Sequence, residues 1–242
     1  MPETLYKFAP SAGWITHLWK SVTRQDHAMW RPTLRRLIPP NGVVIDVGAH
    51  GGQFTRLLAG LVPRGLVLAV EPSGYARSVL KPAMWARGTR NALVVAMALG
   101  DEPGVAMLHT PIKRRGDMGY GLANIAAGAS EAASVAEPVA VTTLDLLVAA
   151  LGLSRVDFVK ADIEGHEGAL ISGARTTLRR YRPALLLELD ASHLARAGAD
   201  INELWAQLVV ESYQPHTLAD GVLTPLQPDR PQPGDILWLP NP

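Results

Sequence analysis

Two short segments carry the residue types that a nucleoside-binding site needs. In residues 43–52, a β-branched apolar run reaches Asp46 and passes into a turn with three glycines. Residues 66–71 form a second apolar run, which ends in Glu71. Small residues let a backbone pass close to a ligand, and a carboxylate at the end of the next strand can accept hydrogen bonds from ribose hydroxyls. Together they predict a nucleoside-containing cofactor at the edge of an α/β sheet.

The glycine spacing narrows the choice of cofactor. A dinucleotide-binding loop needs Gly-x-Gly-x-x-Gly, so that the backbone can approach a pyrophosphate. Counting from Gly48, His50 stands at the second glycine position and Gln53 at the last. The loop therefore departs from the dinucleotide pattern at two places. With Asp46 ahead of it, the loop instead resembles the first motif of S-adenosylmethionine-dependent methyltransferases.

That resemblance implies a role for each residue of the loop. The backbone around Gly48 and His50 would hold the methionine part of the cofactor, and Glu71 would hold the ribose. Asp46 would order the loop, or reach the amino group of the cofactor through water. The plain alternative is an ordinary turn between a strand and a helix.

Composition sets limits on the class of protein. The chain has 242 residues, a net charge of +1 and no cysteine. The balanced charge gives no electrostatic reason to bind nucleic acid or an anionic membrane, and the lack of cysteine excludes disulfides and thiolate zinc sites. No apolar run reaches the ~18 residues of a membrane span, and no signal peptide is apparent at the N-terminus. These features predict a cytoplasmic protein.

The pattern along the chain divides it into two parts. Residues 1–40 are predicted to form an N-terminal helical cap, with a lid or a dimer contact as the alternative. Residues 41–242 alternate apolar strands with helices, as βαβ units do, and end in a predicted hairpin that turns at Asp220-Gly221. This predicts a mostly parallel sheet with an antiparallel C-terminal hairpin. Residues 110–138 are rich in glycine and predict a long loop.

Residues 156–167 form the most specific motif of the chain. An apolar strand delivers Lys160 and Asp162 to the same face, because strand side chains alternate. Asp162 falls near the carboxyl end of that strand, where open α/β sheets bind ligands. Glu164 and Glu167 bracket the start of the next helix, where carboxylates complement the helix dipole.

Six segments in order resemble the FkbM family of methyltransferases. The matching segments are residues 45–50, 70–72, 98–101, 143–145, 160–167 and 183–188. The resemblance implies a Rossmann-like class I methyltransferase fold with a seven-stranded sheet. It also implies S-adenosylmethionine as methyl donor and transfer to a hydroxyl oxygen of a saccharide or another small natural product. It does not identify the acceptor.

Methyl transfer to an alcohol requires that the acceptor be aligned and its proton removed. Asp162 could orient the acceptor, accept the proton or hold a metal ion. His166 is the alternative base, because its ordinary pKa near 6.5 suits the task; its other interpretation is a helix cap. Lys160 could neutralise Asp162 or contact the carboxylate of the cofactor.

Further residues are predicted to lie near the cofactor or to bind a metal ion. Leu99 is predicted to border the adenine, and Asp101 could lie near the adenine or only form a turn. Asp162 together with Glu188 or Asp190 could bind Mg²⁺.

Within the predicted 110–138 loop, Lys113-Arg114-Arg115 could grip an acidic acceptor or form a solvated face. In the same loop, Tyr120 and Asn124 could contact a sugar.

Two other functions compete with the methyltransferase hypothesis. A nicotinamide-dependent oxidoreductase would share the βαβ pattern, although His50 and Gln53 argue against it. A non-catalytic protein that kept only the nucleoside site is the other alternative. Under the main hypothesis the partner is a small-molecule hydroxyl acceptor rather than nucleic acid, and a homo-oligomer is left open.

Overall fold

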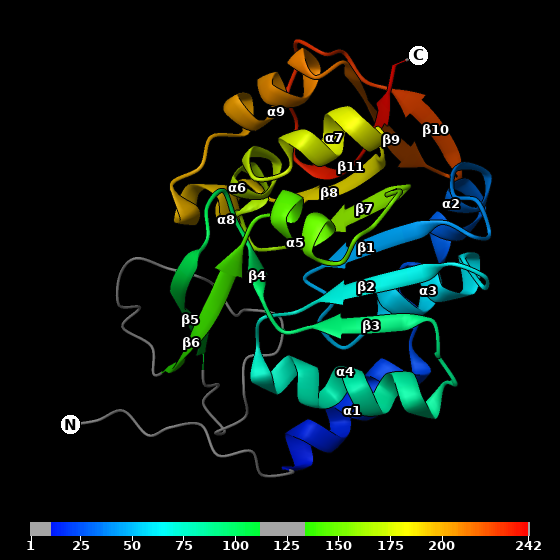
Figure 1. The fold of residues 1–242 in the computed structure, drawn as a ribbon, viewed down its shortest axis with the longest axis vertical. Helices are drawn as coiled ribbons and strands as arrows, with labels where there is room; N and C mark the ends of the chain where they lie inside the picture. Colours follow the sequence, from blue (N-terminus) through cyan, green and yellow to red (C-terminus); the bar gives the residue numbers. More distant parts are fainter. Residues whose placement is uncertain (1–10, 112–133, 242) are drawn as a thin grey trace.

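A central sheet organises the chain, and the computed structural model describes residues 11–111 and 134–241. In the described residues the sheet has eight strands in the order β10-β9-β11-β8-β7-β1-β2-β3 (Figure 1). Its five neighbouring parallel strands are β8 (Ala184–Leu189), β7 (Phe158–Ala161), β1 (Val43–Val47), β2 (Leu66–Val70) and β3 (Ala92–Val95). The predicted mostly parallel α/β fold is confirmed.

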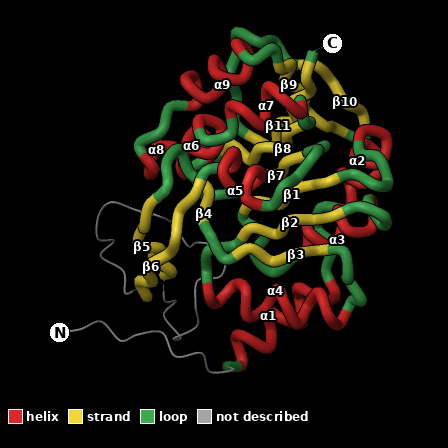
Figure 2. The backbone as a smooth tube through the Cα atoms, in the orientation of Figure 1, coloured by secondary structure: helices red, strands yellow, loops and turns green. Residues whose placement is uncertain are grey.

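Helices cover both faces of the sheet, as the backbone tube in Figure 2 shows. Side chains of β1 alternate between the faces, so Ile45 and Val47 join one core and Val44 joins the other. The first core is covered by α5 (Leu144–Ala150), α6 (Glu167–Ser172), α7 (Arg175–Tyr181), α8 (Ala191–Ala197) and α9 (Ile201–Val210). The opposite face is covered by α2 (Arg31–Leu37), α3 (Gln53–Leu61) and α4 (Gly74–Ala86). Among the described helices, none combines the length and the hydropathy that crossing a membrane requires.

A second, three-stranded sheet lies beside the central one. It contains β4 (Ala98–Leu99), β5 (Gly104–Pro111) and β6 (Ser134–Thr142), with β5 and β6 antiparallel. The predicted loop at 110–138 is therefore too long at both ends, because the paired strands extend through Pro111 and begin again at Ser134. Residues 112–133, including the basic run 113–115, Tyr120 and Asn124, lie outside the described residues.

The C-terminal strands differ from the prediction by one strand. β9 (Tyr213–Ala219) turns at Asp220-Gly221, both with positive φ, as predicted. The return divides into β10 (Val222–Pro225) and β11 (Gly234–Pro240), and β11 inserts between β9 and β8. The sheet thus has eight strands rather than seven, because the tight turn makes β10 an additional edge strand.

The N-terminal segment forms helices that pack on the rest of the chain, as predicted for a helical cap. α1 (Ala12–Thr23) lies against α4, and Trp14 Nε1 donates a hydrogen bond of 3.0 Å to Ser78 Oγ. A 3₁₀ turn, η1 (Ala28–Trp30), leads from there into α2. The division into a cap of residues 1–40 and a domain of residues 41–242 stays a prediction, and residues 1–10 lie outside the described part.

The helix predicted to follow the motif of residues 156–167 is divided into α6 and α7 at Gly173. The two helices are offset because the backbone at Gly173 passes close to the loop after β4. A Cβ added at Gly173 would lie 2.0 Å from the carbonyl oxygen of Gly100. Real Cβ atoms do not approach an oxygen so closely, so this crossing requires glycine.

This contact predicts opposite effects for two glycine-to-alanine substitutions in one stretch of chain. Gly173→Ala should lower the free energy of unfolding by about 1–3 kcal/mol through overpacking. Gly168→Ala in α6, where an added Cβ has nothing within 4 Å, should raise it by about 0.5–1 kcal/mol through helix propensity. Urea denaturation of both variants measures the difference, and equal effects would contradict the close approach.

Candidate active site

A cleft opens at the carboxyl ends of β1, β2 and β7, where the first two loops meet. We call it the cofactor cleft. Its walls are Val47, Gly48, His50, Val70, Glu71, Pro72, Met97, Ala98, Leu99, Leu108, Asp162, Ile163, Glu164 and His166. Open α/β sheets place ligand sites at this edge, so the cleft lies where the sequence predicts a cofactor.

The loop after β1 has the backbone of a ligand cradle. Gly48 and His50 both have positive φ, at 75° and 52°. A Cβ at Gly48 would lie 2.0 Å from the carbonyl oxygen of Asp162. The loops after β1 and β7 therefore touch backbone to backbone, and only glycine at position 48 permits this.

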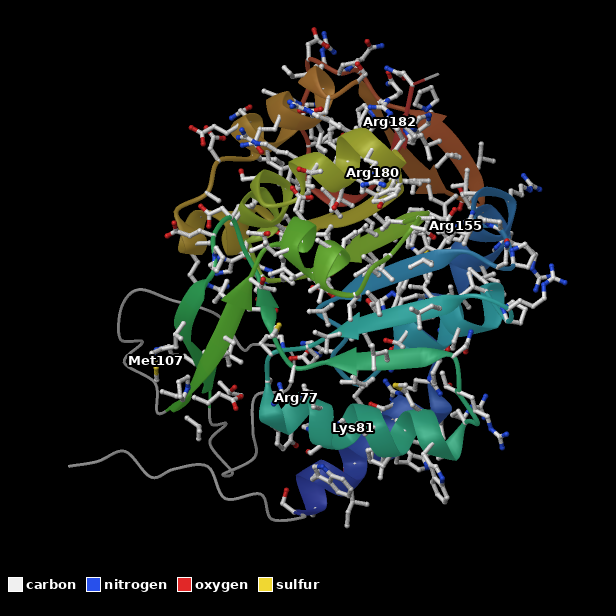
Figure 3. All side chains as sticks on the ribbon, viewed as in Figure 1. Arg77, Lys81, Met107, Arg155, Arg180 and Arg182 are labelled. Carbon is white, nitrogen blue, oxygen red and sulfur yellow. The ribbon has the colours of Figure 1, made fainter. Side chains whose placement is uncertain are left out.

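Glu71 fastens the loop after β1 to the end of β2. Its Oε2 accepts a hydrogen bond of 2.8 Å from the backbone N–H of His50, and its Oε1 accepts one of 2.8 Å from the N–H of Ser73. The side chain is buried in the wall of the cleft. Arg77, labelled on α4 in Figure 3, braces the same turn by donating to the carbonyl oxygens of Glu71 and Pro72. A carboxylate oxygen can accept a second bond, so a fixed Glu71 can still receive a hydroxyl group.

The far wall of the cleft is apolar. Met97, Ala98 and Leu99 line it together with Leu108 of β5. The structure thus places Leu99 where the sequence predicts contact with a base. It does not bring Asp101 to the cleft, because this residue lies exposed in the turn between β4 and β5. The simple turn, which was the alternative interpretation of Asp101, fits that position.

Beneath the cradle lies a buried ionic cluster of Asp46, Lys160 and Asp162. Asp46 Oδ2 accepts a hydrogen bond of 2.6 Å from Thr55 Oγ1, and its Oδ1 lies 3.8 Å from Lys160 Nζ. Lys160 Nζ is closer to Asp162 Oδ2, at 3.2 Å. Lys160 therefore neutralises Asp162, which is one of its two predicted roles, and it does not line the cofactor cleft.

The environment of the cluster shifts the pKa values of its two carboxyl groups in opposite directions. Burial raises the pKa of Asp46, although Lys160 and Thr55 oppose the shift. Burial would raise the pKa of Asp162 too, but the positive charge of Lys160, together with hydrogen bonds from Glu188 and Lys160, outweighs it, and that pKa falls to about 2. Burial lowers the pKa of Lys160, while Asp162 and Asp46 raise it by more. Asp162 is thus ionised and Lys160 charged at neutral pH.

Glu188 of β8 adjoins Asp162. The parallel register pairs Lys160 with Leu186 and Ala161 with Leu187, so the next step brings Asp162 beside Glu188. Glu188 is exposed by area, yet partial desolvation, followed by the negative charge of Asp162 and a hydrogen bond to it, raises its pKa to about 8. At neutral pH a protonated Glu188 can donate to Asp162.

The third predicted metal ligand is engaged elsewhere. Asp190 is the N-cap of α8, and its Oδ1 accepts hydrogen bonds from the N–H groups of Ser192 and His193. Across residues 11–111 and 134–241, no three His, Asp or Glu side chains are grouped as a metal site would require. We therefore derive no role for Mg²⁺ from Asp162, Glu188 and Asp190.

Two acidic residues after β7 hold the bend that leads into α6. Glu164 has φ of 58°, and its Oε2 lies 3.3 Å from His193 Nε2 and 3.7 Å from Arg196 Nη1. Glu167 Oε1 accepts a hydrogen bond of 3.0 Å from the N–H of Ile163. His166 is the N-cap residue of α6 and lines the cofactor cleft. Glu167 therefore shapes the loop that carries Asp162.

A second cavity adjoins the cofactor cleft. The N-terminal segment supplies one wall, and the cradle loop with Lys160 and Asp162 supplies the other. Its lining residues are Lys20, Ser21, Arg24, Asp26, His27, Gly48, Ala49, His50, Gly51, Gln53, Phe54, Lys160 and Asp162. Three of them, Gly48, His50 and Asp162, also line the cofactor cleft. The two spaces therefore meet at these residues.

His27 is the residue of this cavity that the sequence analysis did not identify. Its ring is tilted against that of Phe54, with ring centroids 5.2 Å apart. Burial, followed by the positive charge of Lys160, lowers the pKa of His27 from its ordinary 6.5. A neutral imidazole thus faces the same cavity as Asp162. No motif covers residues 1–40, so no local signal could mark His27.

The proximity of Asp162 to Glu188 makes stability depend on pH. Because folding raises the pKa of Glu188 from 4.5 to about 8, its contribution is complete below pH 4.5 and is lost as pH rises through 8. The melting temperature of the wild type should therefore fall, relative to that of Glu188→Gln, as the pH is raised across this interval. Thermal denaturation at several pH values measures this. The exposed Glu203→Gln variant should follow the wild type, and a parallel course for Glu188→Gln and wild type would refute the assignment.

The fold is the Rossmann-like α/β fold of class I methyltransferase structures, as comparison with solved structures shows. A putative O-methyltransferase from Klebsiella pneumoniae superposes with a TM-score of 0.53 at 11% identity, over 96% of this chain and 92% of that one. The O-methyltransferase from Bacillus cereus, solved in complex with SAH, gives 0.52 at 11% identity over the same shares.

The sequence itself matches the Methyltransferase FkbM domain over residues 46–215. The chain therefore belongs to the FkbM methyltransferase family. The FkbM methyltransferase from Methylobacillus flagellatus KT superposes with a TM-score of 0.52 at 16% identity over 84% of this chain. This chain spans 44% of the length of that protein. No curated protein matches the sequence.

Proposed function

We propose that the protein is an S-adenosylmethionine-dependent O-methyltransferase that acts on a hydroxyl of a saccharide or another small natural product. The observation that carries the proposal is the meeting of two cavities at Gly48, His50 and Asp162. A transferase needs a donor site and an acceptor site that open onto a common point, where the reacting atoms can be aligned. Family membership supplies the reaction class.

The cofactor cleft fits the donor. The apolar wall of Met97, Ala98 and Leu99 suits an adenine, and the fixed carboxylate of Glu71 suits the hydroxyls of a ribose. The left-handed backbone at Gly48 and His50 leaves room for the methionine part. When bound, S-adenosylmethionine supplies a methyl group already activated by a positively charged sulfur.

The second cavity fits the acceptor. Its mouth carries Lys20, Arg24 and Asp26, so it suits a polar molecule better than an apolar one. The formal net charge of +1 supports a small molecule over a nucleic acid as the acceptor. Inside, Lys160 keeps Asp162 ionised, so this carboxylate can accept a hydrogen bond from the acceptor hydroxyl and orient it.

His27 is the group that we assign to proton removal. In the reaction S-adenosylmethionine would supply the methyl group to the acceptor oxygen, with S-adenosylhomocysteine as the leaving group, and the imidazole of His27 would accept the hydroxyl proton. The lowered pKa of His27 keeps this ring neutral at pH 7. His166, the base considered from sequence, lines the cofactor cleft but not the second cavity, which favours His27.

The proposal predicts separate effects on binding and turnover. His27→Gln and Asp162→Asn should bind S-adenosylhomocysteine within about twofold of the wild type while losing about 10²–10⁴-fold in methyl transfer. Transfer is measured with isotopically labelled S-adenosylmethionine and pools of glycosides and polyols, with mass spectrometry of the product. In the wild type, activity should fall at acidic pH with an apparent pKa below 6.5, because protonated His27 cannot accept a proton.

His216→Gln serves as the matched control, because His216 lies on β9 and lines neither cavity. It should keep the activity and the pH profile of the wild type. Undiminished transfer by His27→Gln would show that another group removes the proton. A label found on nitrogen or carbon of the product would contradict transfer to oxygen.

A further inference from the structure

A third cavity lies away from the cofactor cleft, toward the amino ends of the parallel strands. It is lined by Gln25, Arg31, Arg56, Ala59, Gly60, Arg87, Gly88, Thr89 and Asn91. Asn91 immediately precedes β3, whereas the cofactor cleft lies beyond the carboxyl ends of β1 and β2 (Figure 1). The two sites share no lining residue, so their ligands would not compete for space.

The charge of this third cavity is one-sided. Three arginines line it, and no aspartate or glutamate does. Within the described residues, none of Arg31, Arg56 and Arg87 forms an ion pair at 4.0 Å or less. Guanidinium groups gathered without a counter-ion repel one another, and an anion between them would offset this repulsion.

The guanidinium group of Arg56 has hydrogen-bond acceptors for only part of its N–H groups. Its Nη1 and Nη2 each donate a hydrogen bond of 2.7 Å, to the carbonyl oxygens of Val22 and Arg24. Its Nε is buried and has no hydrogen-bond partner. Burial, followed by the positive charge of Arg87, lowers the pKa of Arg56. A buried N–H group of a charged side chain without an acceptor is costly, and the negative charge of an anion near the three guanidinium groups would offset part of that cost.

We propose that this cavity is a binding site for a phosphate group, held by the guanidinium groups of Arg31, Arg56 and Arg87. Arginine presents several N–H donors in a planar fork that matches the oxygens of phosphate. Three positive charges in one cavity favour a dianion over a singly charged carboxylate. The group could belong to free phosphate or to a phosphate monoester, and both would offer the same oxygens to the arginines.

Calorimetric titration with inorganic phosphate and with glycerol 3-phosphate tests the proposal, in chloride buffer with and without S-adenosylhomocysteine. Saturable binding to the wild type should weaken at least about tenfold in Arg31→Gln and in Arg87→Gln. The matched controls are Arg35→Gln and Arg90→Gln. Both substitutions remove one positive charge from an exposed arginine that is nearby in the sequence but does not line the cavity. These should stay within about twofold of the wild type, as screened surface charges do. Arg87 is exposed, so its variant keeps the test valid if Arg31→Gln does not fold.

The outcomes separate the proposal from its alternatives. Tighter binding of the ester would identify a phosphorylated metabolite as the ligand, and tighter binding of inorganic phosphate would identify the free ion. No saturable binding of either probe would overturn the proposal. Equal weakening in the control variants, or displacement of phosphate by S-adenosylhomocysteine, would also overturn it. Since binding of S-adenosylhomocysteine is measured in the same titrations, failure of the methyltransferase proposal would be seen separately.

Discussion

The carboxylate of Glu71 joins the ends of two parallel strands into one binding surface. Backbone hydrogen bonds pair the parallel strands and continue into the first loop residues, because the N–H groups of Gly48 and Ala49 both donate to the carbonyl oxygen of Val70. Glu71 adds to this restraint by accepting hydrogen bonds from the N–H groups of His50 in the first loop and Ser73 in the second. Hydrogen bonds to a charged group contribute about 1.5–3 kcal/mol each. This clamp holds His50 in the left-handed conformation that the cradle requires.

The ionic cluster of Asp46, Lys160 and Asp162 beneath the cradle restrains the loop after β7 in a similar way. The side chains of Asp46 and Lys160 are almost completely buried, with exposures of 0% and 8%. Removing one partner from a buried pair of charges costs about 3–5 kcal/mol, so neither can be replaced singly without loss of stability. Asp162 shares Lys160 with Asp46 but remains at the junction of the two cavities. The charges that stabilise the floor of the site therefore also set the ionisation of the group nearest the proposed chemistry.

Local patterns in the sequence predicted the parts of the site that depend on local structure. The positions of Gly48, Glu71 and Leu99 follow from strand runs and from the turns that end them. The break at Gly173 could not be predicted in this way, because it depends on contact with Gly100, more than seventy residues away.

The other differences between the predicted and the observed structure also depend on contacts between residues that are distant in the sequence. The second sheet pairs β5 with β6 across a long stretch of chain, and neither segment by itself shows which strand it will pair with. His27 reaches the site because α1 packs on α4. Arg56 also fixes the chain before His27 by donating hydrogen bonds to the carbonyl oxygens of Val22 and Arg24. Asp101 follows a strand as a ligand-binding carboxylate would, yet the small sheet turns it toward solvent.

The central claim is that the cleft fastened by Glu71 holds S-adenosylmethionine, and calorimetric titration with S-adenosylhomocysteine tests it most directly. We predict saturable binding with one site per chain, no binding of NAD, and affinity at least about tenfold weaker in Glu71→Gln. The amide of glutamine would turn a donor toward an N–H group that now has an acceptor. Absence of saturable binding, binding of NAD instead, or an unchanged affinity in Glu71→Gln would contradict the account.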